Sequence, residues 1–227
     1  MMDAIKAALQ EGRLTLSEYE SKLLLASYQI PVAKEKLVRN HAELDAAMKD
    51  IGFPLVLKGA SAEISHKTEK GLVMVDIRTP EEATRCFEDL MGSMPRGAQV
   101  LVQEMVSGKR ELLAGLTRDP QFGPCVMFGL GGIFTEILND VAFRVAPLSR
   151  RDAADMMGEI RARKILDAVR GMEEVNREAL ANILISLGKI GLDHDIIKEI
   201  DINPLIVRNG TPIAVDALVV LDGKLRA

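Results

Sequence analysis

Asn209-Gly210 is the sequence feature that most constrains how this chain folds. The pair separates two runs of alternating polar and β-branched residues, and Asn-Gly in that setting is the strongest short-range indication of a β-hairpin with a two-residue turn. Such a turn fixes the register of the hairpin. Extending that register outward places Asn203 opposite Asp216, with their Cβ atoms about 5 Å apart.

The alternation of side chains along a strand divides this hairpin into two faces. One face is polar and carries Glu199, Asp201, Asn203 and Asp216. The other face is apolar and carries Ile200, Ile202, Ile213 and Val215. The first face therefore offers oxygen atoms, whereas the second is expected to belong to the core.

The oxygen-bearing face has two interpretations. An amide oxygen from Asn203 and a carboxylate from Asp216 form a hard site suited to Mg²⁺ that is shared with the phosphates of a nucleotide. Acidic residues on an antiparallel strand are also commonly just its solvated face. Two prolines, Pro204 and Pro212, can moreover shift the register through a bulge. The hairpin by itself leaves both interpretations open.

Composition excludes several functional classes. The chain has 227 residues, of which 48% are hydrophobic and 27% charged, with a formal net charge of −4. These values are typical of a soluble globular protein of one large or two small domains, and the mixed charges indicate neither a nucleic-acid nor a membrane surface. No apolar run approaches the roughly 20 residues that span a bilayer. Cys86 and Cys125 are isolated, and no signal peptide is apparent, so we expect a reducing cytoplasm.

Secondary structure is indicated by caps and by apolar spacing. N-cap residues with an acid three positions later occur at Thr15, Asn40, Thr79 and Ser149. Helices are expected at residues 16–28, 41–50, 80–92, 150–160 and 178–190. Strands are expected at residues 54–58, 72–77, 99–106, 111–117, 124–128, 133–138 and 141–145, before the closing hairpin. This order predicts an α+β protein with an N-terminal lobe of residues 1–100 and a C-terminal lobe of residues 101–227.

Two residues of the predicted N-terminal lobe have side chains suited to phosphate chemistry. Lys58 ends an apolar strand just before Gly59, where an ammonium could meet a phosphate as a point charge. His66 lies in a polar loop between lysines, and a neutral imidazole is a competent phosphoryl acceptor near pH 7. A solvated lysine and a solvated loop histidine are the simpler interpretations, and spacing alone does not separate them from the functional ones.

Two further segments are candidates for nucleotide binding. The strand exit Gln103, Glu104, Met105 and Val106 would suit a hinge with adenine against it, and Glu111 could reach a ribose hydroxyl. The glycines of Gly129-Leu130-Gly131-Gly132 could bring backbone N–H groups close to phosphate. That segment matches neither the P-loop nor the dinucleotide fingerprint, because no helix follows it, and a plain turn is an equally good interpretation.

Together these motifs resemble the β subunit of the ADP-forming acetyl-CoA synthetases, also called NDP-forming acyl-CoA synthetases, whose fold is ATP-grasp. The matching segments are Glu18 to Lys22, Tyr28 to Val32, Phe53 to Lys58, Ser65 to Thr68, Arg118 to Pro124, Phe128 to Ile133, Ala146 to Leu148 and Ile202 to Leu205. The likeness runs from Leu16 to Leu221, nearly the whole chain.

The resemblance implies roles for several of these residues. It places ATP or ADP between two lobes, with Lys58 on the phosphates, Glu104 to Val106 on adenine, and Asn203 with Asp216 on Mg²⁺. It makes His66 a phosphoryl relay. In addition, we expect Asp201 to orient the metal waters or the incoming phosphohistidine. It also implies a CoA-binding α subunit as partner in a hetero-oligomer that makes acyl-CoA, ADP and phosphate from an acid, CoA and ATP.

One departure from the family pattern affects the histidine loop. The family has Asp and a second Gly where this chain has Glu69 and Leu72, and Leu lacks the access of Gly to positive φ. Two alternatives therefore stay open: another ATP-grasp ligase that forms an acyl phosphate without phosphohistidine, and a non-catalytic subunit that senses adenine nucleotide.

Overall fold

The computed structural model describes residues 2–60, 71–132, 140–169 and 171–223. The chain forms two compact units, a larger one of residues 1–32 and 106–227 and a smaller one of residues 33–105. The expected boundary near residue 100 is therefore displaced to the bond between Met105 and Val106. The expectation that residues 1–32 belong to the N-terminal lobe is wrong, because they pack into the core of the larger unit.

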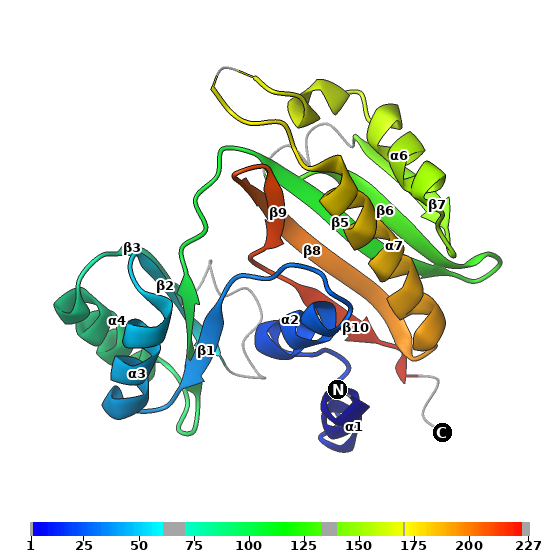
Figure 1. The fold of residues 1–227 in the computed structure, drawn as a ribbon. Helices are drawn as coiled ribbons and strands as arrows, with labels where there is room; N and C mark the ends of the chain where they lie inside the picture. The colour runs from blue at the N-terminus through cyan, green and yellow to red at the C-terminus, as the bar shows by residue number, and fades with distance from the viewer. Residues whose placement is uncertain (1, 61–70, 133–139, 170, 224–227) are drawn as a thin grey trace. The chain divides into compact units, whose positions relative to one another are not determined.

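The smaller unit is a four-stranded antiparallel sheet with two helices. Its elements are β1 (Glu35–Val38), α3 (His41–Ile51), β2 (Leu55–Ala60), β3 (Val73–Ile77), α4 (Pro80–Ser93) and β4 (Gln99–Glu104). The strand order is β1-β4-β2-β3. Helices α3 and α4 lie over one face of this sheet (Figure 1). Leu55, Leu57, Val100 and Val102 point from the strands into the core beneath those helices.

The larger unit is built on a second antiparallel sheet. Its elements are α1 (Met2–Gln10), α2 (Glu18–Ser27), β5 (Glu111–Asp119), β6 (Gly123–Leu130), β7 (Val141–Val145), α6 (Arg150–Glu159), the 3₁₀ helix η1 (Arg163–Leu166), α7 (Arg177–Asp193), β8 (Ile197–Arg208), β9 (Thr211–Ala214) and β10 (Leu218–Leu221). The strand order is β10-β8-β5-β6-β7, and β9 pairs with β8. Helices α6 and α7 cover one face of the sheet (Figure 1), and the main core lies there.

Local capping chemistry explains most helix starts. Asn40 and Thr79 accept hydrogen bonds from the N–H groups of Glu43 and Glu82, and Ser149 forms a reciprocal capping box with Asp152. The expected cap at Thr15 is wrong.

Ser17 caps α2 instead of Thr15, since Thr15 forms an isolated bridge with Val220 and the N–H of Leu16 donates to Val219 O. Because of this pairing with β10, the helix begins at Glu18 and not at Leu16. Among the described residues, no helix has the length and apolar character needed to cross a membrane.

Candidate functional site

The closing hairpin forms in the expected register. Arg208 pairs with Thr211, and the ladder continues to Leu205 and Ala214. Asn209 and Gly210 both have positive φ, 49° and 76°, as a type I′ turn requires.

Asp216 lies just beyond the β8–β9 ladder. Strand β9 ends at Ala214, and β10 resumes the pairing with β8 at Leu218 opposite Asp201. The expected direct pairing of Asn203 with Asp216 is therefore not part of the ladder. Asp216 instead occupies an exposed position in the segment that connects the two strands.

The prolines were predicted to shift the register of the closing hairpin, but the shift occurs where β8 pairs with β5. Pro212 keeps its place in the β8–β9 ladder, opposite Val207. The register shifts instead between β5 and β8, where the pairing skips from Leu112 to Ala114, next to the cis peptide bond between Asn203 and Pro204. Ile202 and Leu205 are both buried in the core as a result. Strand β8 thus has two residues, Asn203 and Pro204, opposite the single Leu113 of β5. This one extra residue interrupts the alternation of side chains at Asn203.

Asp201 lies in an anionic environment on the polar face of the hairpin. Burial, followed by the negative charges of Glu199 and Asp216, raises the pKa of Asp201 to about 6. Glu199 and Asp201 lie two residues apart in β8 and therefore share one face of the strand, as its periodicity predicts. Desolvation and like charges both disfavour the ionised form. A cation at this face would relieve that repulsion.

The glycine segment after β6 meets this same region. The N–H of Gly132 donates to Oδ1 of Asn203 at 3.3 Å, and the N–H of Gly131 donates to the carbonyl of Glu111 at 3.0 Å. A Cβ on Gly132 would lie 2.2 Å from Oε2 of Glu111, and Gly132 has a φ of +63°. Glycine is therefore needed here for both space and conformation. The structure thus brings Glu111, Gly131, Gly132 and Asn203 together.

The oxygen atoms of this region suit Mg²⁺ better than a metal that needs a complete protein cage. Within the described part of the chain, no three His, Cys, Asp or Glu side chains are close enough to hold a metal ion together. Mg²⁺ is commonly bound through one or two protein oxygens and the phosphates of a substrate. The amide oxygen of Asn203, the exposed carboxylate of Asp216 and the repulsion at Asp201 fit such an ion.

In the smaller unit, Lys58 and Gln103 share the sheet face opposite the helices. Lys58 lies within β2 and not at its end, because the strand continues to Ala60, and the residue is only 9% exposed. Lys58 pairs with Leu101, and Val56 pairs with Gln103, which is 2% exposed. The interpretation of Lys58 as a solvated strand end is thereby wrong. Its ammonium is held on a buried face instead.

The segment from Glu104 to Val106 connects the two units. Glu104 exchanges two hydrogen bonds with Lys34, through its own N–H and through Oε1, and the N–H of Met105 donates to Pro54 O. The chain then passes into the larger unit between Met105 and Val106. The expected hinge position thus coincides with the boundary, and no described contact tests its role toward adenine.

His66 lies outside the described residues, as does the expected strand at 133–138. The described chain resumes at Gly71, which has a φ of +67°. Leu72, the departure from the family pattern, is 6% exposed in the smaller core, and its carbonyl accepts from the N–H of Gly59 at 2.9 Å. Leu72 therefore anchors the chain that follows the histidine segment.

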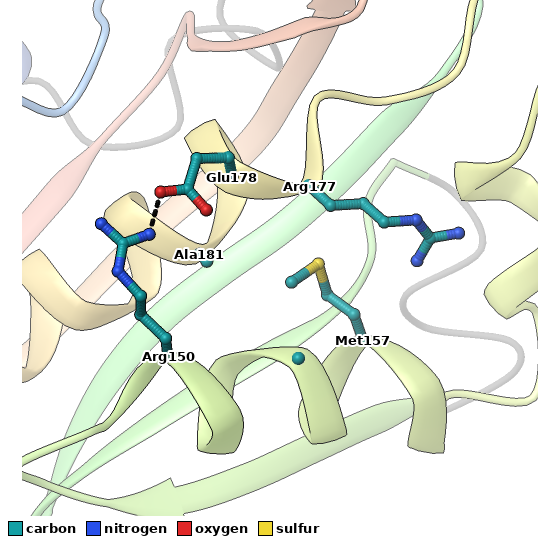
Figure 2. Close-up of a pocket in the computed structure, with 6 residues that line it drawn as sticks. Arg150, Met157, Arg177, Glu178 and Ala181 are labelled. Carbon is teal, nitrogen blue, oxygen red and sulfur yellow. Dashed lines mark hydrogen bonds and ion pairs between the residues drawn. The ribbon is translucent and has the colours of Figure 1, made fainter.

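A surface pocket lies between α6 and α7. Figure 2 shows Arg150 from α6 joined to Glu178 of α7, with Met157 and Arg177 beside them. Arg177 in turn pairs with Asp167 at 2.6 Å. Both arginines that line the pocket therefore already form ion pairs with carboxylates. None of the predicted site residues lines this pocket.

Sequence analysis overlooked one buried charge near the hairpin. Lys22 in α2 is 1% exposed, pairs with Glu18 at 2.8 Å and donates to the carbonyl of Val215. The Glu-to-Lys spacing of four residues on a helix was visible in the sequence. Only the fold shows that this pair is buried beside the segment that carries Asp216.

Comparison with known proteins agrees with this geometry. The family described as ATP-grasp domain matches residues 7–221. The β subunit of acetate–CoA ligase (ADP-forming) I from Pyrococcus furiosus is 44% identical over 225 residues, covering 96% of this chain and 97% of the relative. Acetate–CoA ligase (ADP-forming) I from Archaeoglobus fulgidus is 40% identical, but this chain covers only 33% of its length.

A solved structure shows the same fold. The dinucleotide forming acetyl-coenzyme A synthetase 1 of Ca. Korarchaeum cryptofilum, in complex with coenzyme A and Mg-AMPPCP, has its phosphohistidine segment pointing towards the nucleotide binding site. It superposes with a TM-score of 0.88 at 42% identity, covering 97% of this chain and 99% of that one. The chain belongs to the ATP-grasp domain family and, within it, to the β-subunit type of the ADP-forming acyl-CoA synthetases, which are acid–thiol ligases.

Proposed function

We propose that this chain binds Mg²⁺ with ADP or ATP and exchanges a phosphoryl group between the nucleotide and His66. The observation that carries the proposal is the hydrogen bond from the N–H of Gly132 to Oδ1 of Asn203, two residues from Asp201, whose pKa is raised by burial and by Glu199 and Asp216. Amide and carboxylate oxygens beside a glycine segment are what a metal-bound polyphosphate requires.

Asn203 and Asp216 hold the metal in this proposal. Bound Mg²⁺ supplies neutralisation of the phosphate charges. Asp201, whose pKa is raised to about 6 by burial and its acidic neighbours, orients the water ligands or the phosphohistidine. Gly131 and Gly132, which carry no side chains, let the phosphates approach the backbone closely, and Glu111 contacts the ribose.

The smaller unit contributes the cation and the adenine contacts. Lys58 places an ammonium on the phosphates, and its burial keeps that charge poorly screened. The adenine is contacted by Gln103, Glu104, Met105 and Val106. These assignments are supported by the buried polar face of β2 and β4 and by the position of residues 104–106 where the chain passes from one unit to the other.

The transfer itself requires positioning more than covalent chemistry by the protein. In the ATP-consuming direction, a neutral ring nitrogen of His66 attacks the γ-phosphorus. A P–N bond forms as the P–O bond to ADP breaks, and ADP leaves with that electron pair. In the reverse direction, an oxygen of the ADP β-phosphate displaces the imidazole, which recovers the pair from the P–N bond.

A CoA-binding α subunit completes the reaction in this proposal. The Archaeoglobus fulgidus relative, of which this chain covers one third, supports a partner segment of that kind. The acid and CoA then react on the partner, while this chain supplies or removes the phosphoryl group. The expected assembly is a hetero-oligomer in the cytoplasm.

His66→Ala tests the relay. We expect loss of acyl-CoA synthesis with the α subunit, together with nearly normal ADP binding by calorimetry, because the nucleotide contacts remain. His41→Ala is the matched control, since His41 is an exposed helix residue of the smaller unit. Normal turnover by the His66 variant would exclude the relay.

Two other functions make different predictions. A ligase that forms an acyl phosphate on this chain would leave no acid-labile protein phosphate after incubation with labelled ATP, whereas the relay labels His66. A nucleotide-sensing subunit would bind ADP but would support no ADP–ATP exchange, even with its partner present.

A further inference from the structure

Lys22 and Glu18 form an ion pair inside the larger unit. Nζ of Lys22 lies 2.8 Å from Oε1 of Glu18, and their side chains are 1% and 6% exposed. Burying two charges costs several kcal/mol of desolvation, and apolar residues of similar volume are often equally stable or more stable. Stability of the fold alone therefore gives no reason for a lysine at the centre of α2.

The lysine also contacts the backbone of the hairpin. Nζ of Lys22 donates to the carbonyl of Val215 at 3.3 Å. The N–H of Val215 donates to Pro204 O, also at 3.3 Å. Val215 precedes Asp216, and Pro204 follows Asn203. The residue before Asp216 is thus held at both backbone groups: its carbonyl accepts from Lys22, and its N–H donates to the residue after Asn203.

This contact acts where the strand ladder is interrupted. Asp216 lies between the end of β9 at Ala214 and the start of β10 at Leu218. The carbonyl of Val215 and the N–H of Asp216 belong to one planar peptide unit. Fixing the direction of that carbonyl therefore fixes the starting point of the Asp216 side chain. A buried ammonium on a helix can do this because its own position is fixed by Glu18.

We propose that Lys22, oriented by Glu18, is a positioning residue of the metal site, which sets the carboxylate of Asp216 relative to the amide oxygen of Asn203. The proposal rests on the proposed function, because it requires Asp216 to be a Mg²⁺ ligand. It adds a residue from α2, far away in the sequence and without a metal-binding role of its own.

The experiment measures ADP binding to the full chain by calorimetry over a series of Mg²⁺ concentrations. The double variant Glu18→Leu/Lys22→Met removes the ion pair without leaving one charge buried. We expect its half-saturating Mg²⁺ concentration to rise about tenfold, as for groups that orient metal ligands, with ADP affinity in the absence of Mg²⁺ and the melting temperature unchanged. Lys22→Met alone should show the same shift in Mg²⁺ dependence.

Arg13→Met is the matched control. Arg13 precedes α2 and pairs with Glu20 of α2 at 2.9 Å. Its replacement therefore removes an ion pair to α2 and leaves the contact between Lys22 and Val215 in place. Its Mg²⁺ dependence should equal that of the wild type.

The outcomes separate this proposal from the one on which it rests. An unchanged Mg²⁺ dependence in the folded double variant overturns the positioning role. So does a double variant that unfolds, since the pair would then serve stability. If Asp216→Asn also leaves the Mg²⁺ dependence unchanged, the metal site itself is wrong. A shift with Asp216→Asn and none with the double variant rejects the role of Lys22 alone.

Discussion

The two sheets of this protein hold their candidate functional side chains in different ways. In the smaller unit, Lys58 lies in an unbroken β2–β4 ladder and is almost fully buried. In the larger unit, Asn203 lies beside a register shift, and Asp216 lies between two strands. A regular ladder consumes its backbone groups and offers only side chains, whereas an interrupted one frees backbone groups and lets several segments converge.

That difference teaches where each kind of binding is possible. One ammonium needs only a fixed strand to point at a phosphate. A metal shared with phosphates needs oxygen atoms and N–H donors from several segments, and the contact between Gly132 and Asn203 arises where alternation is relaxed. We therefore predict that substitutions in the larger unit change the Mg²⁺ dependence of ADP binding. Substitutions in the smaller unit should change the affinity for the nucleotide phosphates.

The largest expected effect concerns the metal. Asp216→Asn should raise the half-saturating Mg²⁺ concentration for ADP binding by about 100-fold, because a direct ligand loses at least as much as groups that merely orient ligands. Calorimetry over a Mg²⁺ series measures it. Asp195→Asn, with a side chain 87% exposed, should behave as wild type. If both variants showed the same Mg²⁺ dependence of ADP binding, Asp216 would not be a metal ligand of the larger unit.

Lys58→Met should weaken nucleotide binding about 10- to 100-fold. Hydrogen bonds to charged groups contribute about 1.5–3 kcal/mol, and every 1.4 kcal/mol is tenfold in affinity. The Mg²⁺ concentration for half-saturation should stay the same. Lys36→Met removes an exposed lysine of β1 in the same sheet and should leave ADP affinity intact. A shift in Mg²⁺ dependence for Lys58→Met would show that the two units do not divide the work as proposed.

Asp201→Asn should stabilise the metal-free protein at pH 7 by about 1–2 kcal/mol, from 1.36 kcal/mol per pKa unit discounted for solvent screening. The folded pKa of about 6 lies above the ordinary value of 3.8. The folded state therefore binds more protons, and wild-type stability falls as pH rises from about 4 to 6.

Urea denaturation at several pH values tests this effect. The advantage of Asp201→Asn should vanish below pH 4, where the wild-type carboxyl is protonated in both states. Asp45→Asn, at an exposed position of α3, provides the control and should show no such pH-dependent gain. An advantage that persists at low pH would mean that packing, rather than charge, explains the effect.

Gly132→Ala should change stability by a similar amount in the opposite direction, a loss of about 1–2 kcal/mol. Its φ of +63° is costly for alanine, although the Glu111 carboxylate can move away from the new methyl group. Thermal denaturation measures the loss, and Gly158→Ala on α6, where a Cβ meets nothing within 4 Å, should not destabilise. Equal melting temperatures for both variants would remove the need for glycine at this position.

Much of the local structure could be predicted from the sequence. The caps at Asn40, Thr79 and Ser149 and the hairpin register are confirmed, because each depends on hydrogen bonds within a few residues. Helix α1 and the strands β1 and β10 were missed. The two strands have only four residues each and lie at sheet edges, where the alternation of side chains is too short to recognise.

The sequence by itself determined the turn at Asn209-Gly210, the polar and apolar faces of the hairpin and the family. Local sterics, side-chain periodicity and ordered motifs suffice for these. Only the tertiary structure decided that residues 1–32 join the larger unit, that Lys58 is buried, and that Lys22 reaches Val215. Each of these depends on contacts between segments that are distant in the chain. No local pattern encodes such contacts, because burial and the register between non-neighbouring strands are set by the packing of the whole domain.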